Sequence, residues 1–156
     1  MSIALVNTKE LRKTGQLKRV WKDGMRSRQS LMSSARLLAA LPSEVTGFCA
    51  WGTVRGARSS ASVESLGGEL EARLKSGGHA NAEDRRHAGV VVGIMTELGN
   101  ELRLDNKPAF DDGAFRAPDG RTVKYRVAAV PTESDGDEHC GWIAVGDWWC
   151  ETAPAG

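Results

Sequence analysis

The stretch FRAPDGRTVKYRVAAV, residues 115–130, carries the clearest structural signal in this 156-residue sequence. Its Pro-Asp-Gly triplet at 118–120 predicts a tight turn, because proline presets one turn angle, aspartate bonds to the local backbone and glycine accepts a positive φ. After the turn, Val123, Tyr125 and Val127 alternate with polar residues. This alternation is typical of a strand with one buried face.

Further strands are expected on both sides of this turn. The segment GWIAVGDWW, residues 141–149, predicts a last strand, and residues 45–57 (VTGFCAWGTVRGA) predict an early one. Residues 82–98 are ambiguous, since their acidic start favours a helix whereas three consecutive valines between glycines favour a buried strand. We expect a short helical turn there, then a strand over 89–96, a turn, and another strand in ELRLD, residues 101–105.

Helices are predicted in the first half of the chain. Apolar residues recur at helical spacing over about 7–23, 27–41 and 62–75, although the glycine pair 67–68 conflicts with the last of these helices. The fold class is therefore α+β: basic N-terminal helices followed by a mostly antiparallel sheet of about four or five strands with one intervening helix. We expect a single domain over 1–156, with a basic helical part (1–42) and a mixed part (43–156) that ends in the sheet.

The net charge of +1 hides a strong polarity along the chain. Residues 1–40 contain nine basic and two acidic residues, a net charge of +7. Residues 41–90 contain six of each, and residues 91–156 contain six basic and twelve acidic residues, a net charge of −6. The polarity predicts a basic helical surface and an acidic β surface.

Composition and motifs exclude several functional classes. The three cysteines have no C-x-x-C spacing, so reduced thiols are expected rather than a disulfide framework or a zinc site; a Cys140–Cys150 bridge is the alternative. No glycine-rich phosphate-binding motif occurs, and we expect no cofactor and no bound metal. The apolar stretch at the N-terminus is too short for a secretory signal, and no run approaches the ~20 residues of a membrane span. We therefore expect a cytoplasmic protein with no membrane association.

Cys49 and His87 are the weak catalytic candidates. A thiol hydrolase needs an imidazole that takes the proton of the nucleophilic cysteine. The segment RRHAGVVVGI, residues 85–94, resembles cysteine-dependent peptidoglycan amidases, in which a histidine opens a strand of the core sheet. Those families place their cysteine at a helix N-terminus, whereas Cys49 lies in a segment that predicts a strand. The structural alternative is that Cys49 is a small buried residue and His87 a surface residue.

Two further sets of residues are candidates for binding. The basic set is expected to contact nucleic acid or another acidic partner, or to form only the polar side of amphipathic helices. It comprises Arg12, Lys13, Lys18, Arg19, Lys22, Arg26 and Arg28. The aromatic set, Trp142, Trp148 and Trp149, is expected to contribute to a protein interface or to pack in the sheet, with at least one ring exposed because neighbouring strand residues face opposite sides.

The leading functional hypothesis is a non-enzymatic interaction or assembly protein, of the kind that phages and mobile elements use as accessory proteins. It would use the basic helical surface and the acidic, tryptophan-bearing β surface, either for self-association or for binding a protein partner. One alternative is a nucleic-acid-binding module that uses the basic N-terminal helices. The other alternative is a Cys/His thiol hydrolase.

Overall fold

The computed structural model describes residues 12–27, 31–55, 61–75, 82–105, 107–133 and 139–151. The predicted turn at 118–120 is confirmed. Gly120 has a φ of +89° and donates its N–H to the Ala117 carbonyl (2.9 Å), while Asp119 Oδ1 accepts from the backbone N–H of Arg121 (3.0 Å). The turn joins β3 (Ala109–Arg116) to β4 (Thr122–Thr132).

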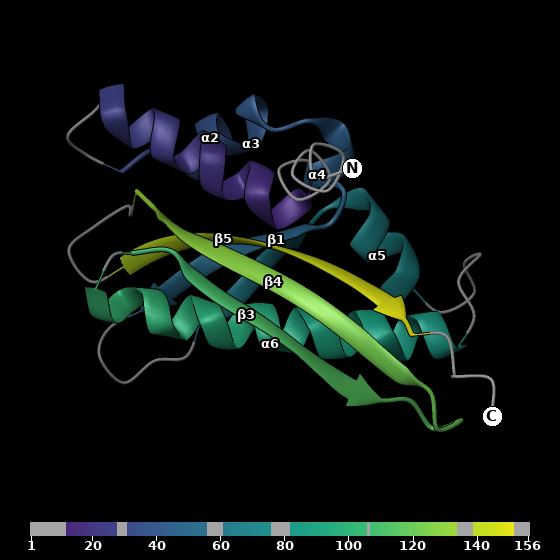
Figure 1. The fold of residues 1–156 in the computed structure, drawn as a ribbon. Coiled ribbons are helices and arrows are strands. Elements are labelled where there is room, and N and C mark those ends of the chain that lie inside the picture. The colour runs from purple at the N-terminus through teal and green to yellow at the C-terminus, as the bar shows by residue number, and fades with distance from the viewer. Residues whose placement is uncertain are drawn as a thin grey trace, which may run out of the picture.

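These two strands belong to a five-stranded sheet with the order β2-β1-β5-β4-β3, in which every neighbouring pair is antiparallel (Figure 1). The other strands are β1 (Cys49–Arg55), β2 (Ala61–Leu66) and β5 (His139–Cys150). The α+β class and the antiparallel sheet predicted from the sequence are thereby confirmed. The two ends of β5 carry Cys140 and Cys150, about 30 Å apart at strand rise, so the alternative of a bridge between them is wrong.

Helices cover both faces of the sheet (Figure 1). On one face lie α2 (Lys13–Ser27), α3 (Ser34–Ala40) and the short α4 (Ser43–Thr46). On the other face lies α6 (Ala82–Asp105), with α5 (Gly68–Leu74) packed beside it. No helix among the described residues is long and apolar enough to cross a membrane.

Alternation along the strands divides the core into two layers. Leu17 of α2 and Leu37 of α3 pack against one set of strand residues: Cys49, Ala128, Val130, Ile143 and Val145. The α6 layer contains Val91, Met95, Leu98 and Leu102, which pack against the other set of strand residues: Ala50, Val54, Val127, Ala129, Trp142 and Ala144. Both faces of the sheet are therefore covered over its centre. A hydrogen bond also connects α2 to the sheet, because Trp21 donates its Nε1–H to the Pro131 carbonyl of β4 (3.0 Å).

The strands predicted over 89–96 and 101–105 are wrong. Both segments belong to α6, which has 24 residues. Its buried residues recur every three or four positions (Ala88, Val91, Met95, Leu98 and Leu102), the spacing of one helix face. Packing of this face on the sheet outweighs the strand preference of the valine run.

Other predicted boundaries also change. The helix expected over 62–75 is a strand, β2, followed by α5, and the glycine pair lies at their junction. The first helix continues through Gly24 to Ser27, and the second begins only at Ser34. Gly24 is tolerated because it makes room for Met32, whose Cε would lie 2.3 Å from a Cβ at that position.

Candidate functional site

His87 lies between α6 and the sheet, not on the surface. Its side chain is 3 % exposed, and its ring stands edge-on to the Phe115 ring of β3 at 5.7 Å. Nε2 has no hydrogen-bond partner among the described residues, and the nearest acidic atom, Glu83 Oε1, is 3.8 Å away, too far for a hydrogen bond. A buried polar atom without a partner costs about 1–3 kcal/mol, so this nitrogen is a marked feature of the interior.

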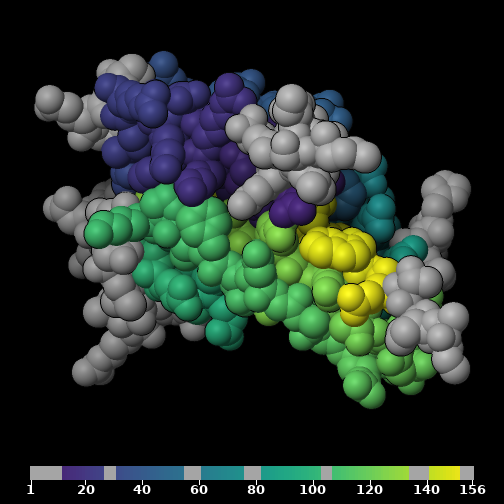
Figure 2. All heavy atoms as spheres, viewed as in Figure 1, coloured from purple at the N-terminus to yellow at the C-terminus, as the bar shows by residue number. Residues whose placement is uncertain are grey.

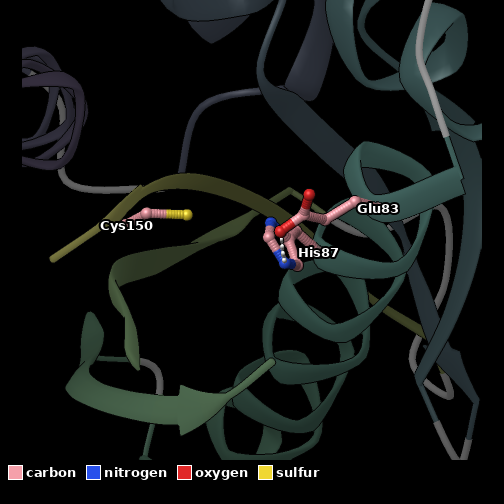
Figure 3. Close-up of side chains that lie close together, drawn as sticks. All are labelled: Glu83, His87 and Cys150. Carbon is pink, nitrogen blue, oxygen red and sulfur yellow. Dashed lines mark ion pairs between the residues drawn. The ribbon is translucent and has the colours of Figure 1, made fainter. Parts of the chain in front are cut away.

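Glu83, His87 and Cys150 form one cluster (Figure 3). Glu83 and His87 are one turn apart on α6 and therefore share a face. Cys150 ends β5 on the side that faces α6, because it has the parity of Trp142 and Ala144. The carboxylate oxygen, the imidazole nitrogen and the thiol sulfur lie within 4.8 Å of one another, and the thiol is at the exposed side of the cluster.

The turn between β3 and β4 holds the acidic member of this cluster. Arg121 Nη2 donates to Glu83 Oε1 (2.8 Å), and its Nε donates to Asp119 Oδ2 (2.7 Å). Hydrogen bonds from the backbone and side chain of Arg121 lower the pKa of Asp119, so this carboxylate stays ionised and keeps the guanidinium in place. Arg121 therefore positions Glu83 next to His87.

Cys49 and His87 are not brought together. Cys49 is fully buried in the layer under α2 and α3, whereas His87 is on the opposite face of the sheet. The Cys49 thiol donates to the Val45 carbonyl (3.3 Å), and burial raises the pKa of this thiol to about 12. The pairing of these two residues as nucleophile and base is wrong. The resemblance to the amidases also fails in context, because His87 lies within a helix and does not open a strand.

This difference between the two thiols predicts selective labelling. With iodoacetamide at pH 8 and EDTA present, Cys150 of the folded protein is expected to react at least about 100-fold faster than Cys49, because only a thiolate attacks and Cys49 is protonated and enclosed. Peptide mass spectrometry over a time course measures the two rates. In urea, the rates are expected to converge. Equal rates in the native protein would contradict the described burial of Cys49.

The predicted basic residues of α2 lie on two sides of that helix. Lys18, Arg19, Lys22 and Arg26 line a shallow hollow on the solvent side, together with Gly15 and Asp23. We call these four basic residues the basic face. Lys13 instead points to the sheet, where Nζ pairs with Asp147 Oδ1 (2.7 Å) and lies 4.6 Å from the Phe48 ring centroid. Arg12 is half-buried just before α2, and Arg28 is outside the described residues.

An acidic groove lies between α6 and the edge strand β3. Its volume is about 540 Å³, and its lining comprises Val90, Gly93, Ile94, Glu97, Leu98, Glu101, Phe110 and Asp111. Val90 and Phe110 are 37 % and 50 % exposed, so apolar surface accompanies the three carboxylates. The groove adjoins the basic face, because Lys18 Nζ lies 5.2 Å from the centroid of the Phe110 ring. Figure 2 shows α2, in purple, bordering the green surface of β3.

The three tryptophans of the predicted aromatic set have different surroundings. Trp142 is fully buried in the core, so it is no interface residue. Trp148 is half-buried and packs edge-on against Phe48 (5.9 Å), with the Arg73 guanidinium 5.4 Å from its ring. Trp149 is 44 % exposed, which agrees with the expectation that one ring reaches the surface.

The acidic residues of the sheet are largely paired. Asp112 pairs with Arg126 (3.2 Å), and Glu151 pairs with Lys124 (2.9 Å). The excess negative charge of residues 91–156 therefore does not form an acidic sheet face around Trp149. Among the described residues, three of these acids, Glu97, Glu101 and Asp111, lie together in the groove beside α6. Residues 134–138, which include three further acidic side chains, are outside the described residues.

Sequence reasoning missed Glu83 and Cys150 as neighbours of His87, and it missed the groove. The spacing of Glu83 and His87 was a usable signal, but only if the segment had been identified as a helix. Cys150 comes close to His87 only because the end of β5 packs under α6. No local sequence pattern predicts that packing.

No protein-family model matches the chain, and no curated protein shows significant similarity to it. Its function is inferred from the geometry of its own residues.

Proposed function

We propose that the protein is a non-enzymatic interaction protein that self-associates through two neighbouring surfaces of opposite charge. These surfaces are the basic face of α2 and the acidic groove between α6 and β3. The observation that carries the proposal is their contact at Phe110, which lines the groove and lies under Lys18.

Adjacent patches of opposite charge are self-complementary. A second copy related by a two-fold axis places its basic face on the groove of the first copy, and the same contact forms again on the other side of the axis. The exposed side chains of Phe110 and Val90 supply apolar area at the centre of such a contact, and the charges form its rim. Complementary charge steers encounter and fixes register more than it adds affinity.

Charge reversal tests the dimer. Arg19→Glu/Lys22→Glu places acids on the basic face, and Glu97→Lys/Glu101→Lys places bases in the groove. Each double variant is expected to be monomeric by sedimentation or light scattering, because like charges then face each other. A mixture of the two variants is expected to form a heterodimer, because an acidic surface of one variant then meets a basic surface of the other at both contacts. For the wild-type protein, the dimer is expected to dissociate as salt rises, since exposed charges are screened beyond about 10 Å at 0.1 M.

A charge-matched control uses exposed residues outside both surfaces. Lys75→Glu/Arg86→Glu changes the net charge by the same amount as the α2 variant, and it is expected to leave the dimer intact. A wild-type protein that is monomeric at low salt and high concentration would contradict the proposal. So would a mixture of reversed variants that does not associate.

A nucleic-acid-binding module is the second candidate, because the basic face gathers four basic residues with a single acid, Asp23. Four phosphate contacts predict a salt dependence of log K with a slope of about −3.6 for duplex DNA. Fluorescence anisotropy with a labelled duplex measures this slope. DNA binding that falls steeply with salt, and that is lost in Arg19→Glu/Lys22→Glu, would favour this candidate over self-association if the wild-type protein is monomeric.

A further inference from the structure

We propose that Glu83, His87 and Cys150 bind a zinc ion. This inference concerns the α6 face of the sheet and does not depend on the proposed function. It departs from the sequence-based expectation of no bound metal.

The donor set fits zinc by type. Zn²⁺ accepts cysteine sulfur, histidine nitrogen and carboxylate oxygen, usually in a tetrahedron, and three protein ligands leave a fourth position for water or another ligand. Magnesium and calcium prefer all-oxygen sites, so a sulfur and nitrogen pair argues against them. The three donor atoms lie within 4.8 Å of one another. Zn–ligand bonds of about 2.0–2.3 Å require donors roughly 3.3–3.7 Å apart, so rotation of the exposed Cys150 side chain and of Glu83 would complete the site.

The buried imidazole is the independent observation that points to a ligand. His87 is 3 % exposed, and its Nε2 faces the carboxylate of Glu83 without a hydrogen bond among the described residues. A metal ion between the carboxylate and this nitrogen would give Nε2 the partner that it lacks. The ring itself is held by Phe115, so its orientation does not depend on the ion.

Arg121 provides the outer contact that metal-binding carboxylates commonly have. It donates to Glu83 Oε1, the same oxygen that lies 3.8 Å from His87 Nε2, and so holds the carboxylate beside the imidazole. Its positive charge opposes a second cation nearby, but Asp119 pairs with the same guanidinium at 2.7 Å and offsets that charge. The Glu83 carboxylate is thus oriented for binding by the β3–β4 turn. An ion at this position would connect the first turns of α6 to the end of β5.

Metal titration of the full-length, untagged protein tests the proposal. After EDTA treatment and its removal, the protein is titrated with Co²⁺ and then with Zn²⁺. The expected result is one ion per chain, a thiolate-to-cobalt charge-transfer band, and loss of that band when zinc displaces cobalt. Isothermal titration gives the zinc affinity, and thermal unfolding with and without zinc gives a second readout, because a ligand that binds only the folded state raises the Tm.

Two variants at the accessible side of the cluster decide the outcome, since His87 is buried and its replacement would disturb the core as well as the site. Cys150→Ser is expected to abolish the charge-transfer band, and Cys150→Ser and Glu83→Gln are each expected to weaken zinc binding by at least about 100-fold. Glu151→Gln, which removes a neighbouring carboxylate paired with Lys124, is the matched control and is expected to bind zinc as the wild type does. A band that persists in Cys150→Ser, or the absence of one-to-one binding in the wild type, would overturn the proposal.

Discussion

Trp142→Ala is expected to lower the free energy of unfolding by about 3–5 kcal/mol, the range for removing a large buried aromatic side chain. Trp142, the fourth residue of β5, is fully buried and is in register with Gly52 of β1 and Pro131 of β4. Its ring lies directly against α6, since a Cβ at Gly99 would come within 3.0 Å of its Cδ2. Urea denaturation measures the change as a lower midpoint with an unchanged slope.

Trp149→Ala is the matched control for this prediction. Trp149 is on the same strand and is 44 % exposed, so its truncation is expected to change stability by less than about 1 kcal/mol. Trp142→Phe is expected to lie between the two alanine variants, because it keeps most of the apolar volume and removes an indole nitrogen that has no hydrogen-bond partner among the described residues. Similar losses for Trp142→Ala and Trp149→Ala would contradict the assignment of one ring to the core and the other to the surface.

The sheet was predictable where local chemistry determines it. The turn at 118–120 needs a residue that accepts a positive φ, and Gly120 adopts φ +89° there. The alternation after it fixes which residues of β4 face each layer, and the last predicted strand, 141–149, lies within β5 (His139–Cys150). These features depend on neighbours in the sequence, so a single sequence is enough to find them.

The segment 82–105 was not predictable in the same way. Its valines favour a strand by intrinsic preference, and two glycines, Gly89 and Gly93, weaken a helix. Both glycines are on open surface, where a Cβ would have no atom within 4 Å, so neither marks a close approach of backbone. The helix forms because one face of it covers the sheet, and that tertiary contact does not appear in a short window of sequence.

The candidate site was only partly predictable for a related reason. His87 was identified as a chemically capable residue, but its partner was chosen among cysteines without knowledge of the faces of the sheet. Cys49 lies on the α2 side, while Cys150, at the far end of another strand, lies on the α6 side. The charge polarity likewise locates acidic residues along the chain without saying which are paired. Lys124 and Arg126 of β4 pair with Glu151, just after β5, and with Asp112 of β3, so these two acids do not contribute free negative charge to the sheet surface.

The glycine pair 67–68 gives the second large expected effect, because its two members have opposite surroundings. Gly67 precedes α5 with a φ of −64°, which any residue adopts, so its backbone conformation does not require glycine. The surroundings of Gly67 do require glycine, because a Cβ there would lie 2.0 Å from the Thr46 carbonyl oxygen and 2.6 Å from Gly47 backbone atoms. Those atoms belong to the segment that binds the start of α5, where the Gly47 carbonyl accepts from Glu69 and Leu70 (both 3.0 Å).

Gly67→Ala is therefore expected to lower the free energy of unfolding by about 3 kcal/mol, the upper end for overpacking, because backbone and not a flexible side chain must move. Gly68→Ala is expected to raise it by about 0.5–1 kcal/mol, because nothing lies within 4 Å of the added methyl group and alanine favours the helix that begins there. Urea denaturation of the two single variants gives both signs. If both variants were stabilised, the close contact at Gly67 would be refuted. If both were equally destabilised, α5 would not begin at Gly68. Opposite signs at adjacent glycines would mean that the sequence marks a strand-to-helix junction here, not a weak point inside one long helix.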